Sequence, residues 1–212
     1  MRFIVENCSK CKDFGLEFNR NYKPVEFLEG KPSSEIWIIG LNPAEDEDWK
    51  DKGRDFQDLS NCLNDSTKIH PYFKGFKKVS PILFEKFGKE NGVAHTDLIK
   101  CSSRRWPPVS CKGKKINEVI NNCQDYLSTQ IEIFKPKLII CNGAPVSHKI
   151  KEILKPKNWL TDTVYESETN KEQKVIVVLS GFIGRIDNFS KRRLGYEIES
   201  IISGLKKSTN AS

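Results

Sequence analysis

Four short segments rich in isoleucine and valine constrain the fold of this chain more than any other feature. Each is five to seven residues long and bounded by turn signals, which predicts a buried strand: Glu35–Gly40, Val93–Ile99, Lys137–Cys141 and Lys174–Leu179. A helical pattern follows the second segment, because seven residues of Ile116–Phe134 form one apolar face. Strands that alternate with helices predict a three-layer α/β/α fold around a central, mainly parallel four-stranded sheet.

A second clear helix lies near the end of the chain, and weaker helical patterns cover Phe56–Leu63 and Val79–Phe87. The apolar stripe of the last helix contains Leu194, Ile198, Ile201, Ile202 and Leu205. A length of 212 residues is enough for one well-filled core and short for two. We therefore expect a single domain over residues 1–212, with an N-terminal knuckle at 1–34 and a frayed tail at 206–212.

The charge of the chain favours a polyanionic partner. Lys and Arg number 35 against 28 Asp and Glu, a formal charge of +7. Nucleic acid is the first candidate for such a partner. The apolar runs are too short to span a membrane, and the first residues do not resemble a signal peptide. We expect a cytoplasmic monomer, associated with the nucleoid if the cell is prokaryotic.

Ligands of parallel α/β folds bind outside the carboxyl ends of the strands. The four loops at these ends are therefore the candidate sites. They contain Gly40-Leu41-Asn42-Pro43, the segment 100–108, Asn142-Gly143-Ala144, and Ser180 to Arg185.

The loop after the second strand is strongly basic. Between Leu98 and Asn117 there is no acidic residue, and the cations are Lys100, Arg104, Arg105, Lys112, Lys114 and Lys115. Such a block predicts contacts with phosphates. Trp106 lies inside it, and its ring either contacts a base or belongs to the core.

A second basic cluster, Lys191, Arg192 and Arg193, lies near the start of the last helix. Cations there oppose the helix macrodipole, which predicts a phosphate bound between them and the first amides. The alternative is that the helix begins elsewhere.

Seven cysteines in a cytosolic chain favour a metal site over disulfides. Cys8 and Cys11 alone have ligand spacing, and Cys101 and Cys123 would complete a set of four thiolates. Such a set suits zinc or an iron–sulfur cluster. Cys111 is an alternative to Cys101 or Cys123, and Cys123 taken alone is typical of a core thiol.

The motifs resemble the uracil-DNA glycosylase superfamily, most closely its iron–sulfur branch (families 4 and 5). Gly40–Pro43 resembles the first family motif, in its mismatch-specific-like Gly-x-Asn-Pro form, and Gly53–Phe56 resembles the segment after it. Asp97–Cys101 resembles the segment with the base-reading residue and a cluster cysteine. Cys123–Leu127, followed by Lys135–Ile140, matches the last cluster cysteine and the next strand.

The resemblance implies a DNA repair glycosylase of base excision, which flips a damaged or deaminated base out of DNA and hydrolyses its N-glycosidic bond. It implies a 4Fe-4S cluster on Cys8, Cys11, Cys101 and Cys123, with zinc as the alternative. Asn42 would position water, and Ser180 or nearby amides would bind the leaving base. The base-binding residues would be Gly40, Leu41, Phe56, Asp97 and Asn142. The DNA-binding residues would be Arg104, Arg105, Trp106, Arg185, Lys191, Arg192 and Arg193.

Two positions depart from the family pattern. Leu179–Phe182 replaces a segment that usually begins with a histidine, and Asp97 replaces an asparagine. An ionised carboxylate only accepts hydrogen bonds, so Asp97 would repel O4 of uracil and suit an amine or ring N–H of cytosine, adenine or hypoxanthine. Asp97 could instead be protonated or point away. We expect a weakened preference for uracil.

Two other functions remain open. The first is a catalytically silent relative that keeps the cluster and binds damaged or single-stranded DNA. The second is a nucleotide-binding α/β enzyme of another kind, which is less favoured because the chain has no phosphate-loop motif.

Overall fold

The central sheet has six strands, not the predicted four. The computed structural model describes residues 8–11, 27–43, 69, 71–103, 106–107, 113–170 and 172–209, and its strands lie in the order β2-β1-β3-β6-β5-β4. The four predicted segments form β1 Ile36–Gly40, β2 Val93–Asp97, β3 Leu138–Cys141 and β6 Lys174–Val178. These four pair in parallel, so the α/β class and the parallel centre of the sheet are confirmed.

The two additional strands make the sheet mixed. β5, Val164–Glu168, pairs antiparallel with β6, and the two-residue β4, Asn158–Trp159, pairs antiparallel with β5. The segment of β5 reads Val-Tyr-Glu-Ser-Glu. It has one valine and no isoleucine, so it lacks the richness in these residues by which the other strands were recognised, and the prediction of four strands was wrong.

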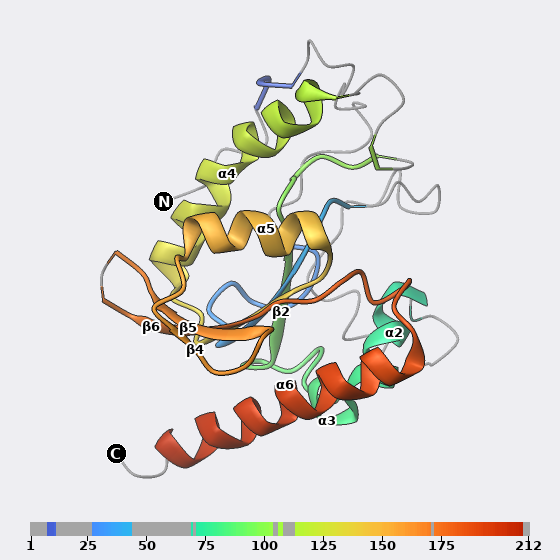
Figure 1. Ribbon diagram of the computed structural model, residues 1–212, viewed down its shortest axis with the longest axis vertical. Helices are drawn as coiled ribbons and strands as arrows, with labels where there is room; N and C mark the ends of the chain where they lie inside the picture. The colour runs from blue at the N-terminus through green and yellow to red at the C-terminus, as the bar shows by residue number, and fades with distance from the viewer. Residues whose placement is uncertain are drawn as a thin grey trace.

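Five helices in the described part of the chain cover the sheet on both faces (Figure 1). α4, Lys114–Phe134, and α5, Ala144–Ile153, lie on one face, whereas α2, Pro71–Val79, α3, Pro81–Phe84, and α6, Asn188–Thr209, lie on the other. None of these helices is long and apolar enough to cross a bilayer. α4 and α6 confirm the two clear predictions, and α6 extends to Thr209, into the predicted tail. α5 was not predicted, and Phe56–Leu63 lies outside the described residues.

Both faces of the sheet are packed, so every residue of β1 is buried. Trp37 and Ile39 belong to the core beneath α4 and α5, and Ile36 and Ile38 belong to the core beneath α2, α3 and α6. A fully buried aliphatic side chain contributes about 1.5–3 kcal/mol to folding. The two clusters therefore fix the strands whose carboxyl ends form the candidate site.

Close packing of α6 against α2 depends on one glycine. A Cβ atom on Gly195 would lie 2.0 Å from the carbonyl oxygen of Val79, the last residue of α2. Ser80 accepts a hydrogen bond from the amide of Leu83, which caps α3, and donates to Glu199 of α6 at 2.7 Å. The proline that follows Ser80 begins α3, so the predicted helix over Val79–Phe87 is divided here.

Glu29 is a buried carboxyl beside β2, and it predicts a pH-dependent stability. Burial raises the pKa of Glu29 to about 7, against hydrogen bonds from Gly88 and Gly30 that lower it. Between pH 4.5 and about 7, Glu29 therefore keeps its proton in the folded protein but loses it in the unfolded chain. The free energy of unfolding consequently falls as the pH rises through this window.

We expect Glu29→Gln to be up to about 3 kcal/mol more stable than wild type at pH 8 and nearly equal at pH 4.5. Urea unfolding at a series of pH values measures this difference. A difference that stays constant across the pH range would contradict the assignment to Glu29.

Candidate functional site

A buried polar cluster lies where β1, β2 and β3 end. His95, Asp97 and Asn142 are 1%, 3% and 1% exposed, respectively. The hydroxyl of Tyr72, from α2, lies 2.6 Å from Nε2 of His95 and accepts a hydrogen bond from Nδ2 of Asn142 at 2.9 Å. Burial raises the pKa of Tyr72, and the charge of Asp97 raises it further, so the phenol stays protonated and its oxygen lies near that carboxylate. Tyr72 was not predicted, because no motif surrounds it.

The absence of a side chain at Gly40 lets Asp97 and His95 lie against β1. Gly40 pairs with Asp97 in the sheet, and a Cβ atom on Gly40 would lie 2.2 Å from Oδ1 of Asp97 and 3.2 Å from Cε1 of His95. Oδ1 of Asp97 thus lies over the end of β1. A substitution at Gly40 would displace the carboxylate.

The side chain of Asn42 is oriented by two hydrogen bonds that its amide group donates. Nδ2 donates to the carbonyl oxygen of Pro43 at 3.0 Å and to Oγ of Ser103 at 2.8 Å. A carbonyl only accepts, which identifies the nitrogen of this amide. Oδ1 of Asn42 accepts no hydrogen bond from the described residues, so it can accept one from a water molecule.

The other two predicted polar residues are engaged within the protein. Oδ1 of Asn142 accepts from the amide of Ile183 at 2.9 Å, so Asn142 joins Tyr72 to the loop after β6. The hydroxyl of Ser180 donates to the carbonyl oxygens of Cys141 and Gly181, at 2.7 and 2.9 Å. Its hydrogen is therefore directed at the backbone in this structure.

The loop after β6 places an aromatic ring at the margin of the cluster. Phe182 is 42% exposed and stacks on Tyr72, with ring centroids 6.4 Å apart. The backbone N–H groups of Gly181 and Phe182 donate to no group in the described part of the chain. Arg185 follows on the surface. Leu41, at the end of β1, packs instead against the core beneath α4 and α5.

The four predicted cysteines gather beside the first half of α4. Cys11, Cys101 and Cys123 are buried, and Cys8 is partly buried. The hydrogen bond from Cys101 lowers the pKa of Cys123 to about 7, and that bond together with burial raises the pKa of Cys101. Cys8 and Cys11 are close enough to raise the pKa of Cys101 further, and the hydrogen bond with Cys8 raises that of Tyr126 to about 12.

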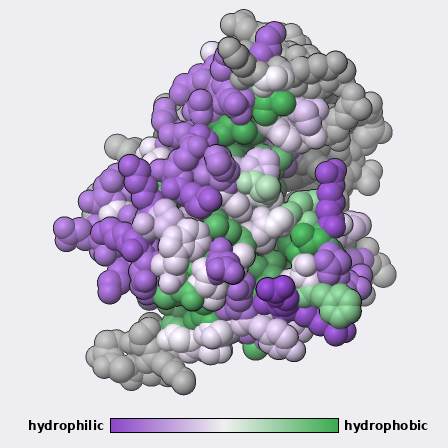
Figure 2. Space-filling model, in the orientation of Figure 1, coloured by the Kyte–Doolittle hydropathy of each residue, from purple (hydrophilic) through white to green (hydrophobic). Residues whose placement is uncertain are grey.

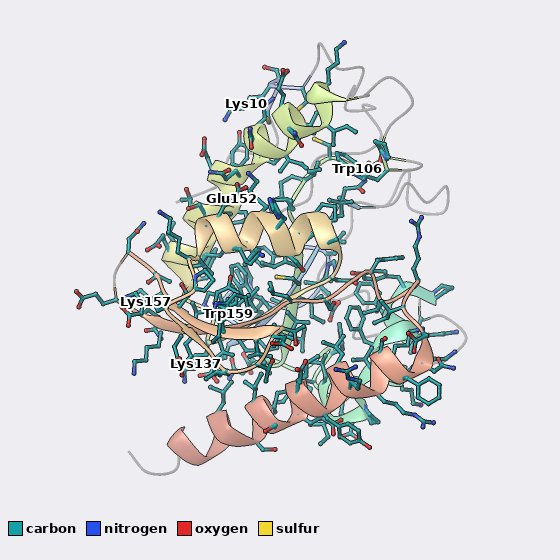
Figure 3. All side chains as sticks on the ribbon, viewed as in Figure 1. Lys10, Trp106, Lys137, Glu152, Lys157 and Trp159 are labelled. Atoms are coloured by element: carbon teal, nitrogen blue, oxygen red, sulfur yellow. The ribbon has the colours of Figure 1, made fainter. Side chains whose placement is uncertain are left out.

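Two lysines provide positive charge next to these thiols. Lys100 is 1% exposed, and its ammonium donates to Oγ1 of Thr96 at 2.6 Å and to Oε1 of Gln130 at 2.9 Å. Lys10 lies against α4, beside Asp125 and over the ring of Tyr126 (Figure 3). Both charges contribute to lowering the pKa of Cys123, so they favour its thiolate form.

The thiols are gathered but do not form a metal site of defined geometry. No group of three or more His, Cys, Asp or Glu side chains in the described part of the chain is arranged to hold a metal ion. The chemistry of the donors, four sulfurs near two cations, fits an iron–sulfur cluster or zinc. Cys111 lies outside the described residues.

The basic loop after β2 is only partly as predicted. Lys100 is buried, so its grouping with the phosphate-contacting cations was wrong. Trp106, which is labelled in Figure 3, is partly buried and packs against the core beneath α4 and α5. Arg104 and Arg105, like Phe56, lie outside the described residues, and their roles remain predictions.

Two of the amides at the start of α6, where a bound phosphate was predicted, are already occupied. The carboxylate of Asp187 accepts hydrogen bonds from the amides of Phe189 and Ser190, at 2.8 and 2.9 Å. An acidic residue thus already caps these amides. Lys191, Arg192 and Arg193 follow the cap, and the two arginines are exposed.

Comparison with known proteins identifies the family to which this chain belongs. The sequence pattern of the Uracil DNA glycosylase superfamily matches residues 27–188, which include all six strands and the polar cluster. The chain belongs to the uracil DNA glycosylase superfamily.

Two relatives within the superfamily are named Type-4 uracil-DNA glycosylases. The protein from Sulfurisphaera tokodaii is 30% identical over 140 residues, which cover 66% of this chain and 51% of the relative. The protein from Saccharolobus solfataricus is 27% identical over 160 residues, covering 76% of this chain and 60% of the relative. The chain thus matches about half to three fifths of the length of these glycosylases.

Proposed function

We propose that this superfamily member is a DNA repair glycosylase that hydrolyses the N-glycosidic bond of a base flipped out of DNA. The orientation of Asn42 is the observation that supports this function most directly. Its amide hydrogens are held by Pro43 and Ser103, and its carbonyl oxygen faces no donor among the described residues. A water molecule held by that oxygen would lie beside the buried cluster around Tyr72.

The reaction needs charge stabilisation more than proton transfer. When the bond between C1′ and the base nitrogen breaks, the electron pair leaves with the base and the sugar becomes cationic. An amide does not accept a proton at neutral pH, so Asn42 positions water. The water oxygen bonds to C1′, and its proton passes to the departing base anion through solvent. We assign the leaving base to the N–H groups of Gly181 and Phe182, which would hydrogen-bond its oxygen where the family has a histidine. Ser180 positions this loop. The negative phosphates of the DNA stabilise the positive charge on the sugar.

Asp97 is the residue that we propose reads the base edge, with Gly40 providing the space and Phe56 stacking on the base. The carboxylate lies within the cluster instead of pointing away from it. Asn142 supports this edge through its hydrogen bonds to Tyr72 and Ile183, whereas Leu41 would act only through the backbone at the end of β1.

We propose that Cys8, Cys11, Cys101 and Cys123 hold a 4Fe-4S cluster. Bound there, the cluster ties the segment around Cys8 to α4 and to the chain that follows Asp97. Hydrolysis transfers no electrons, so this role is structural.

A base-release assay tests the proposed function. Single- and double-stranded oligonucleotides with one uracil, hypoxanthine, xanthine or unmodified cytosine are incubated with wild type and with Asn42→Ala as the control. Release by wild type that falls in the control supports the glycosylase. Tight binding of every substrate without release would favour the catalytically silent relative.

The Asp97→Asn variant is expected to release uracil faster than wild type. An amide can donate to O4, whereas the carboxylate repels it, and one badly paired buried group costs about 1–3 kcal/mol. The expected gain is therefore about 5- to 150-fold in single-turnover rate. Efficient uracil release by wild type that Asp97→Ala abolishes would overturn this reading of Asp97.

A further inference from the structure

The outer face of α6 exposes aromatic rings between arginines. Phe189 and Tyr196 are 78% and 73% exposed, although large aromatic side chains are usually buried. Arg192 and Arg193 lie between them, and spacings of three, four and seven residues place all four side chains on one face of a helix. We call Phe189, Arg192, Arg193 and Tyr196 the α6 outer face.

The acidic residues of α6 are engaged with neutral hydroxyl groups of other segments instead of with these arginines. Glu197 accepts hydrogen bonds from Thr161 and Thr163, and Glu199 accepts one from Ser80. Neither arginine forms an ion pair with any residue that the structure describes. The α6 outer face is therefore positively charged.

The neighbouring helix extends the positive surface. Lys74, Lys77 and Lys78 are exposed on α2, which packs against α6 through Gly195 and Val79. Hydrophilic and hydrophobic side chains lie side by side over the first turns of α6 (Figure 2). This part of α6 directly follows the loop of Phe182 and Arg185, so the surface adjoins the polar cluster.

We propose that the α6 outer face binds single-stranded DNA next to the target base. Unpaired bases offer planes on which exposed aromatic rings stack, whereas a duplex covers those planes and offers mainly phosphates. Phe189 and Tyr196 are about 10 Å apart along the helix, the length of about three base steps. The arginines between them neutralise phosphates. This inference rests on the proposed function and names the strand state that the site prefers.

Fluorescence anisotropy with a labelled 20-mer that contains no damaged base tests the surface in single-stranded and blunt duplex form. The double variant Phe189→Ala/Tyr196→Ala is expected to bind the single strand at least about 25-fold more weakly, because stacking of a base on each of the two rings contributes at least about 5-fold to Kd. Duplex affinity should change less than about threefold, because duplex contacts are mainly to phosphates. Arg192→Gln/Arg193→Gln should reduce the salt dependence for the single strand by about 1.4 in log–log slope.

Matched controls separate this surface from general effects. Trp159→Ala removes an exposed aromatic ring from β4, and Lys155→Gln/Lys174→Gln removes two exposed cations on the β4–β6 side of the sheet. Both should bind like wild type, and thermal unfolding verifies that each variant is folded.

Unchanged single-strand affinity in the aromatic variant, or an equal loss for both DNA forms, would overturn the proposal. Base release by the same proteins separates the two hypotheses. If wild type releases no base but the aromatic variant loses single-strand affinity selectively, the proposed surface is supported and the proposed glycosylase function is contradicted. If wild type releases the base but the aromatic variant binds the single strand as wild type does, the glycosylase is supported and the proposed surface is contradicted.

Discussion

The Cys123→Ser variant is expected to purify without iron, whereas wild type should be brown with a broad absorption band near ~400 nm. Cys123 is a thiol whose pKa is lowered to about 7, by Cys101 first and by the two lysines, so a large share of it is thiolate near neutral pH. A serine hydroxyl does not replace a thiolate ligand. Iron and sulfide analysis, with the absorption spectrum, measures the loss.

Two other cysteine variants serve as controls for this prediction. Cys141→Ala changes a fully buried thiol on β3 and should keep the full iron content. Cys111→Ser should also keep the full iron content. Iron loss in that variant would show that Cys111 is a ligand in place of Cys101 or Cys123. A colourless wild-type protein with one zinc per chain would contradict the proposed iron–sulfur cluster. The assignment of the four cysteines as metal ligands would still stand.

The Asn42→Ala variant is expected to lose about 10²- to 10³-fold in single-turnover base release, the usual effect of removing one group that is preorganised for the transition state. Oδ1 of Asn42 is the acceptor that we assign to the attacking water. The affinity for damaged DNA should change little, because phosphate contacts dominate it. Quenched-flow base release and anisotropy measure the two quantities separately.

Ser103→Ala gives the graded comparison. Nδ2 of Asn42 keeps its hydrogen bond to Pro43 and loses the one to Ser103. The loss of one hydrogen bond corresponds to about 2- to 13-fold in rate. If Ser103→Ala matched Asn42→Ala, or if affinity fell in parallel with rate, Asn42 would not act by positioning water.

Sequence patterns predicted the elements whose character is local. β1 and β3 are continuous apolar runs because helices cover both faces of the sheet, and α4 shows its buried stripe along its own length. β5 was missed because only its first two residues are apolar or aromatic and the three that follow are polar. The gathering of Cys101 and Cys123 was predicted from their resemblance to family motifs.

The rest of the site depends on contacts between distant segments. Tyr72 enters the cluster only because α2 packs across the end of β2, and no pattern near Tyr72 indicates this. Lys100 was grouped with its basic neighbours, but Thr96 and Gln130 enclose its ammonium group beneath α4. Sequence spacing cannot distinguish an enclosed lysine from a solvated one.

Both margins of the sheet are closed to strand addition. The outer side of β2 is occupied by Leu28 and Glu29, whose backbone exchanges hydrogen bonds with His95 at 2.8 Å. The other margin is β4, which is only two residues long. Short or covered edge strands do not template pairing with another chain. Pairing of two copies edge to edge through the strands that the structure describes is therefore disfavoured.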